Sequence, residues 1–236
     1  AGRVLVLDGD PTNGTVNAAL WRGNGQSLTD ASPAVRALAL SHARAGAITG
    51  TLDDPATASL AQAAYTLVVY PDDATVAALA AHDVDTILVP YGASGAQALT
   101  FGLDRAGGLE KVGNTNSGIV WRVRPGAIKP SRVRVESSGG ITTDVGSSQL
   151  RVDGNVDASG TLILAERADS GWHASVDGVA LMPTEPVDGW AQAFDMPAAG
   201  HLTVTYRAWW IIPWRVGAGI CLVVVAASAL SVWRKR

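Results

Sequence analysis

Residues 161–206 read TLILAERADSGWHASVDGVALMPTEPVDGWAQAFDMPAAGHLTVTY, and short runs within this stretch alternate apolar and polar residues. A period of two places successive side chains on opposite faces of a strand, and Asp-Gly pairs between the runs are typical of tight turns. The same pattern begins upstream, and the expected strands are 132–135, 149–152, 161–164, 172–176, 190–194 and 201–206. Turns are expected at 153–154, 177–178 and 188–189. Short strands with no helix between them predict a β-sandwich-like domain over residues 131–207.

The region before this domain mixes strand-like and helix-like patterns. Strands are expected at 3–7, 17–22 and 85–90, a hairpin at 109–123, and helices at 33–45, from 55, 74–82 and 94–106. Residues 65–70 fit either a strand or the end of a helix, and the helix is preferred. Helices that alternate with strands predict an α/β layer domain over residues 1–125, followed by a linker at 126–130.

The carboxyl-terminal region has an eighteen-residue run without charge, 216–233, flanked by tryptophan and arginine. A run of this length is near the lower limit for crossing a bilayer as a helix. Tryptophans at both ends resemble an aromatic belt. We therefore expect a transmembrane helix at 209–233 rather than a buried core helix. The expected fold class is α+β: a small α/β layer domain, a β-sandwich-like domain and one C-terminal transmembrane helix.

The orientation of this helix follows from its basic end. Residues 234–236 are Arg-Lys-Arg, so the positive-inside rule predicts a cytoplasmic tail and an extracytoplasmic position for residues 1–208. Arg215 opposes this orientation, but a single arginine can snorkel from a helix end. The expected membrane-interface residues are Trp209, Trp210, Trp214, Arg215, Trp233, Arg234, Lys235 and Arg236.

Composition excludes several classes of protein. The formal net charge of −3 lacks the basic footprint of a nucleic-acid binder, so no nucleic-acid partner is expected. The single cysteine excludes a disulfide framework, and the four histidines lack metal-ligand spacing. No metal and no cofactor are therefore expected. The first residue is not methionine, which indicates a piece of a longer protein.

Two short motifs suggest chemistry, and each has a plainer interpretation. Asp8-Gly9-Asp10 has the spacing that sugar-nucleotide transferases use to hold a divalent metal, but an acidic turn is commoner. Ser94 follows a predicted strand, where a nucleophile elbow would expose a serine. Ala96 breaks that motif, so Ser94 is expected to cap a helix. No catalytic residue is predicted.

Several strings resemble a known group of proteins. They are GWHASVDG at 171–178, DGWAQAF at 188–194 and PAAGHLTVTY at 197–206, with LWRGNG at 20–25, VDTILVP at 84–90, GLEKVG at 108–113 and VWRV at 120–123. The later strings resemble the terminal β-module of YfhO-like membrane proteins. The whole order resembles the C-terminal extracytoplasmic region of large actinobacterial membrane glycosyltransferases of family 2.

That resemblance implies a non-catalytic segment. The family's catalytic region would lie upstream, so none of its catalytic residues is carried over. The implied partners are the lipid bilayer, the upstream transmembrane and catalytic domains of the same chain, and a polysaccharide or lipid-linked sugar. The implied location is the cell membrane.

Trp172 and Trp190 are candidates for carbohydrate contact, because flat aromatic faces bind sugar rings. His173, Asp177 and Asp188 lie near them in sequence and would orient a sugar. Aromatic residues at strand spacing usually pack in the core, and this role is favoured.

The predicted function is the non-catalytic extracytoplasmic part of a membrane glycosyltransferase that acts in cell-envelope polysaccharide assembly, in contact with glycan or lipid-linked sugar. The alternative is a non-enzymatic, membrane-anchored surface or interaction module. An anchored hydrolase that uses Ser94 is the third and weakest hypothesis.

Overall fold

The computed structural model describes residues 2–21, 40–44, 47–48, 55–124, 129–140, 142–145, 152–207 and Cys221. Strands dominate this part of the chain, with sixteen strands against three α-helices. The predicted fold class, an α/β layer domain with a sandwich and a transmembrane helix, is therefore wrong. None of the helices in the described ranges is long and apolar enough to cross a bilayer. The prediction for 209–236 falls outside the described residues except for Cys221, which is helical and exposed.

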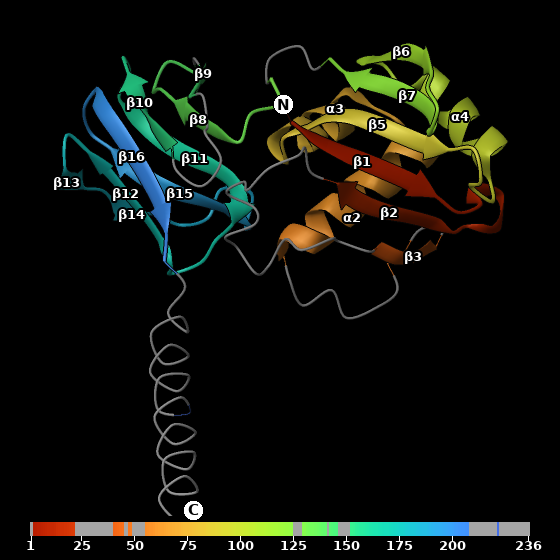
Figure 1. Cartoon of the computed structure of the whole chain (residues 1–236), viewed down its shortest axis with the longest axis horizontal. Coiled ribbons are helices and arrows are strands. Elements are labelled where there is room, and N and C mark those ends of the chain that lie inside the picture. The colour runs from red at the N-terminus through yellow and green to blue at the C-terminus, as the bar shows by residue number, and fades with distance from the viewer. Residues whose placement is uncertain are drawn as a thin grey trace, which may run out of the picture.

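The first lobe, residues 2–124, is built on a seven-stranded sheet with the order β4-β3-β2-β1-β5-β7-β6 (Figure 1). Its strands are β1 (Arg3–Asp8), β2 (Val16–Trp21), β3 (Leu40–Arg44), β4 (Ala47–Ile48), β5 (Val84–Pro90), β6 (Leu109–Asn114) and β7 (Gly118–Val123). The central pair β1 and β5 is parallel, and the other neighbours are antiparallel. A parallel pair needs a long crossover, and the described part of this one contains β2 to β4 and two helices.

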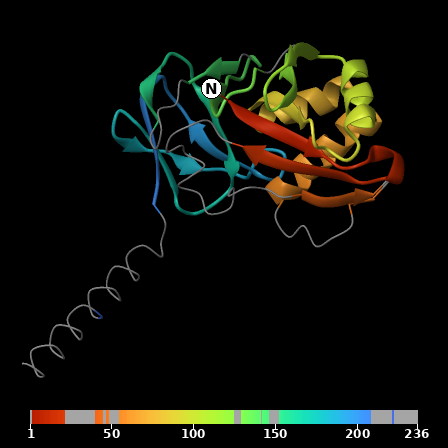
Figure 2. The ribbon, with the colours of Figure 1, turned by 45° about the vertical axis from the view of Figure 1, so that its right-hand side comes forward.

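Three helices pack on one face of this sheet (Figures 1 and 2). They are α2 (Pro55–Val69), α3 (Asp73–Ala81) and α4 (Ala96–Arg105), and a short 3-10 helix, η1 (Pro11–Asn13), follows β1. Leu5 and Leu7, two residues apart on β1, are fully buried in one core with Leu60, Leu79 and Leu103 from the helices. The apolar face of the strand thus packs against the apolar faces of the helices.

The helix predicted at 33–45 is wrong where the structure describes it, because residues 40–44 form β3. This strand pairs with β2 through Val16 opposite Ala43 and Ala18 opposite Leu40. Pairing with the sheet outweighs the local helical pattern, since strand formation depends on neighbours more than on intrinsic preference. By contrast, the helices predicted from 55, at 74–82 and at 94–106 are confirmed, and residues 65–69 belong to α2.

The second lobe, residues 129–207, consists of two facing sheets (Figure 1). One has the order β10-β16-β12-β13 and the other β14-β15-β11-β8-β9. The strands are β8 (Val133–Glu136), β9 (Thr142–Asp144), β10 (Val152–Val156), β11 (Gly160–Arg167), β12 (Trp172–Val176), β13 (Val179–Ala180), β14 (Met182–Pro183), β15 (Ala191–Met196) and β16 (Gly200–Tyr206). Between the sheets lies an apolar core that includes Trp172 and Phe194.

Two of the Asp-Gly pairs form turns and one does not. Asp177 and Gly178 have φ of 48° and 80° and connect β12 to β13, so the predicted hairpin turn is confirmed. Asp188 and Gly189 also have positive φ. The turn predicted at 153–154 is wrong, because both residues lie inside β10 and pair with β16.

Strand β11 is buried on both faces. One face packs in the sandwich core and the other packs against the first lobe, so the strand joins the two lobes. Leu162 and Leu164 point into the sandwich core, whereas Ile163 and Ala165 belong to a separate apolar cluster. That cluster also contains Ala56 and Ala81 of the first lobe. The outer face of this sheet is therefore covered by the first lobe instead of by water.

A buried ion pair lies beside this apolar contact. Arg3, at the start of β1, is 2% exposed, and its guanidinium lies 2.6 Å from the carboxylate of Glu166, which is 0% exposed. The same guanidinium donates to the carbonyls of His82 and Ala165 at 2.9 and 2.7 Å. Residues from the start of the first lobe and the middle of the second are thus held together away from solvent.

Removing one partner of this pair is expected to destabilise the whole protein. Glu166→Ala would leave the Arg3 charge buried without its counter-ion, at a cost of about 3–5 kcal/mol in the free energy of unfolding. Lys111→Ala removes a half-exposed pair with Asp104 and should cost under about 1 kcal/mol. Urea denaturation of both variants measures the difference, and equal losses would show that the interlobe pair is unimportant.

Candidate functional site

The structure separates the predicted carbohydrate-contact residues into two clefts. Trp172 and His173 line the sandwich cleft, a hollow of about 530 Å³ in the second lobe that is also lined by Asp169, Gln192 and Phe194. Trp172 is only 4% exposed, donates its indole N–H to the carbonyl of Arg167 at 3.2 Å, and packs on Tyr206. Little of its ring is left for a sugar.

The Gln192 amide of the sandwich cleft is used internally. The Gln192 side chain accepts from the Asp169 N–H and donates to the Ala193 carbonyl, both at 3.0 Å. Burial, together with the Asp169 carboxylate, raises the pKa of Tyr206 to about 12. The Gln192 amide is therefore committed to the fold, whereas Ser170 and His173, which also line the cleft, are exposed.

Trp190 and Asp188 line a different hollow, the interlobe cleft. Its volume is about 490 Å³, and its walls are Ser59 of α2, alanines of α3, Arg134 and Glu136 of β8, and the loop that ends at Trp190. Trp190 is 3% exposed, and its ring stacks on that of His82 at 3.8 Å with 9° between the planes. Asp188 is exposed at the mouth.

Asp177 belongs to neither cleft. Its carboxylate accepts the backbone N–H of His201 at 2.9 Å, which ties the β12–β13 turn to β16. The expected site residues are thus spread over the two clefts and one turn, and a carbohydrate role for them stays a prediction.

A cluster of buried ionisable groups lies behind the interlobe cleft. Burial lowers the pKa of His82 to about 3, with Arg3 and Arg134 adding repulsion, so the imidazole is neutral. Its Nε2 lies 3.0 Å from the Ser59 hydroxyl. Burial raises the pKa of Asp83 to about 6, although Arg3 and Arg132 favour its charged form. Sequence analysis predicted no site at these residues.

The third hollow, the strand-end groove, lies where the parallel strands β1 and β5 end. It consists of adjoining hollows of about 480 and 200 Å³ that share Thr12, Ala98 and Phe101 as walls. In open sheets, ligands bind beyond the carboxyl ends of parallel strands. The groove brings together the two motifs that the sequence set apart, because Asp10 and Ser94 line it.

In the structure, residues of both motifs form hydrogen bonds that hold the local backbone turns. Asp8 accepts from the N–H groups of Gly9 and Ser94 at 2.7 and 2.9 Å, which links the end of β1 to the loop before α4. Asp10 accepts from Thr12 and Asn13, so the acidic-turn interpretation is confirmed. A side chain at Gly95 would collide with the backbone of Gly9, which explains glycine at this close approach.

A hydrolase that pairs Ser94 with His82 is not supported by this geometry. Ser94 follows β5 whereas His82 precedes it, so a seven-residue strand of roughly 20 Å separates the two. The helix-cap role predicted for Ser94 is also wrong, because α4 begins at Ala96 with Gly95 at its N-cap and no side-chain cap. No cluster of three potential metal ligands occurs in the described ranges.

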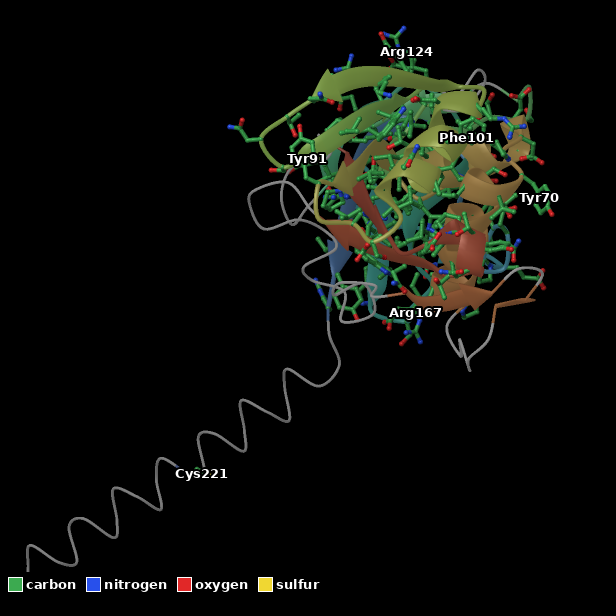
Figure 3. The ribbon with its side chains drawn as sticks, turned by 90° about the vertical axis from the view of Figure 1, so that its right-hand side faces the viewer. Tyr70, Tyr91, Phe101, Arg124, Arg167 and Cys221 are labelled. Atoms are coloured by element: carbon green, nitrogen blue, oxygen red, sulfur yellow. The ribbon has the colours of Figure 1, made fainter. Side chains whose placement is uncertain are left out.

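Exposed aromatic residues gather at this end of the first lobe, and sequence analysis missed them. Phe101 on α4 is 64% exposed, Tyr91 after β5 is 58% exposed and Tyr70 after α2 is 74% exposed. Figure 3 looks onto this end, with Phe101 between the other two. The guanidinium of Arg105 lies 5.4 Å from the centre of the Phe101 ring. For Phe101, the available signal in the sequence was an aromatic residue on the solvent-facing side of a predicted helix, where a polar residue is usual.

Comparisons with protein-family models, with curated proteins and with solved structures find no match for this chain. The resemblance to membrane glycosyltransferases is therefore still a prediction from the quoted strings. The membrane-interface residues at 209–215 and 233–236 lie outside the described residues.

The raised pKa of Asp83 predicts a pH dependence of stability. The folded protein keeps a proton between about pH 4 and 6 that the unfolded chain has released, so the Asp83 contribution is fully present below pH 4 and is lost as pH rises through 6. Asp83→Asn replaces the ionisable carboxyl and so removes this loss of stability at high pH. Asparagine also tolerates the φ of 60° at this position. The free energy of unfolding of the variant, measured against that of the parent protein, should be roughly 2–3 kcal/mol higher at pH 8 than at pH 4.

Urea denaturation at the two pH values measures this gain. Asp195→Asn, at an exposed position of β15, is the control for loss of a carboxylate. A gain that is the same at pH 4 and pH 8 would contradict the assignment of the titrating group.

Proposed function

We propose that this chain is the non-catalytic, glycan-contacting part of a membrane glycosyltransferase of envelope polysaccharide assembly, and that the strand-end groove makes the contact. The observation that carries the proposal is Phe101, which stands 64% exposed between two adjoining hollows. Sugar rings bind exposed aromatic faces, with polar side chains that fix their orientation.

Polar groups surround Phe101 at suitable places. Thr12, Ser94 and Gln97 line the groove and are exposed, and Asp10 beside them is half-buried. The hydrogen bonds that Thr12 makes to Asp10 lower the pKa of that carboxyl, so Asp10 is an acceptor at neutral pH. Two linked hollows suit a chain of sugars better than a single ring.

The geometry also favours binding over catalysis. Ser94 lies at the opposite end of β5 from His82 and cannot reach it, and the described residues hold no cluster of three potential metal ligands. Asp8 and Asp10, the residues that resemble a metal-binding pair, are occupied by backbone turns. Together these observations support a contact surface whose chemistry is supplied elsewhere in a larger protein.

Loss of the aromatic ring should weaken glycan contact. Phe101→Ala in the full chain is expected to weaken binding to an array of bacterial envelope oligosaccharides about ten-fold, the equivalent of about 1.4 kcal/mol. Met182→Ala, at a 74% exposed apolar residue of the second lobe, is the control and should bind as the parent does. Absence of binding by the parent protein, or undiminished binding by Phe101→Ala, would refute the proposed contact.

The link to a glycosyltransferase has its own test. The residues that precede Ala1 in the intact gene product are expected to contain a family 2 catalytic domain with an Asp-x-Asp motif, followed by several membrane spans. Sequencing that region checks the expectation. A secretion signal directly before Ala1 would favour the surface-module alternative.

A further inference from the structure

We infer that the interlobe cleft is a second ligand site, which holds one or two rings of a neutral, polyhydroxylated ligand such as a free sugar. The cleft of about 490 Å³ falls within the range of small-ligand sites. It opens between α2 and α3 of the first lobe and β8 and the 187–190 loop of the second. It is separate from the strand-end groove, which lies at the other end of β1 and β5.

The strongest indication is a buried donor. Arg134 is 2% exposed, and its Nε donates to Glu136 at 3.0 Å. Its Nη1 is buried without a hydrogen-bond partner. An unsatisfied donor on a charged group is costly, and native proteins rarely leave one. A ligand oxygen at the inner end of the cleft would supply the acceptor.

The helix side of the cleft is small and apolar. Ala74, Ala77, Ala78 and Ala81 of α3 contribute only methyl groups, and the space of the cleft exists because these side chains are short. Trp190 also lines the cleft, belongs to the same apolar cluster as Ala81, and is held in place by its stack on His82. The alanine methyl groups suit the apolar C–H face of a sugar ring, whereas the stacked Trp190, 3% exposed, bounds the cleft.

Charge selects a neutral ligand over an anion. Arg134 is already neutralised by its ion pair with Glu136, and Asp188 adds a further carboxylate at the mouth. An anion would meet a net negative lining. Hydroxyl groups both accept and donate, so a polyol can satisfy Arg134 and the carboxylates together.

A cleft-filling variant tests the site without disturbing Arg134. Ala77 is half-buried on α3, so Ala77→Phe should fill the cleft while the helix stays folded. Gln62→Phe, at an exposed position of α2, is the matched control. Binding of glucose, galactose, rhamnose and inositol to the full chain is measured by calorimetry and by the shift in Tm, with glucuronate and galactose-1-phosphate as charged comparators.

At least one neutral sugar is expected to bind the parent protein and Gln62→Phe equally, and Ala77→Phe and Arg134→Met about ten-fold more weakly or not at all. If Arg134→Met does not fold, Ala77→Phe alone decides. No neutral sugar binding to the parent, unchanged binding by Ala77→Phe, or preference for the charged comparators would each overturn the inference. Phe101→Ala should retain this binding, which separates the site from the proposed glycan contact.

Discussion

The fold depends on the burial of Arg3 against Glu166 where the two lobes meet. A guanidinium 2% exposed and a carboxylate 0% exposed are stable only as partners, because an isolated buried charge is very costly. Arg132 lies 3.7 Å from Asp83 and 3.9 Å from Glu166, so the pair extends into a small network. Through Arg3, this network links the carbonyl of His82, in the α3–β5 turn, to Ala165 and Glu166 of β11.

Local patterns in the sequence predict individual elements well. The hairpin of β6 and β7, the helices α2 to α4 and the Asp177-Gly178 turn all appear where periodicity and turn chemistry place them. The overall class fails because strand pairing is decided by distant partners. β3 and the two-residue strands β13 and β14 exist through their neighbours, and such short segments carry no period of their own.

The candidate sites were hidden for a related reason. Arg132, just before β8, and Arg134 within it alternate with valines, a pattern typical of a strand with one face in water. The first lobe covers that face, so both arginines are buried or nearly so. The apolar run of β11 was the available signal, since a strand without polar alternation is usually covered on both sides. Trp190 was recognised as an aromatic candidate, but its stacking partner His82 lies over a hundred residues earlier.

The sequence distance between Arg3 and Glu166, 163 residues, has a consequence for synthesis. A nascent chain exposes the first strand long before the carboxylate that neutralises it leaves the ribosome. Contacts of such long range are slow to form, because loop closure precedes any gain from them. The amino-terminal lobe therefore emerges with the apolar surface around Ala56 and Ala81 uncovered until β11 has been synthesised.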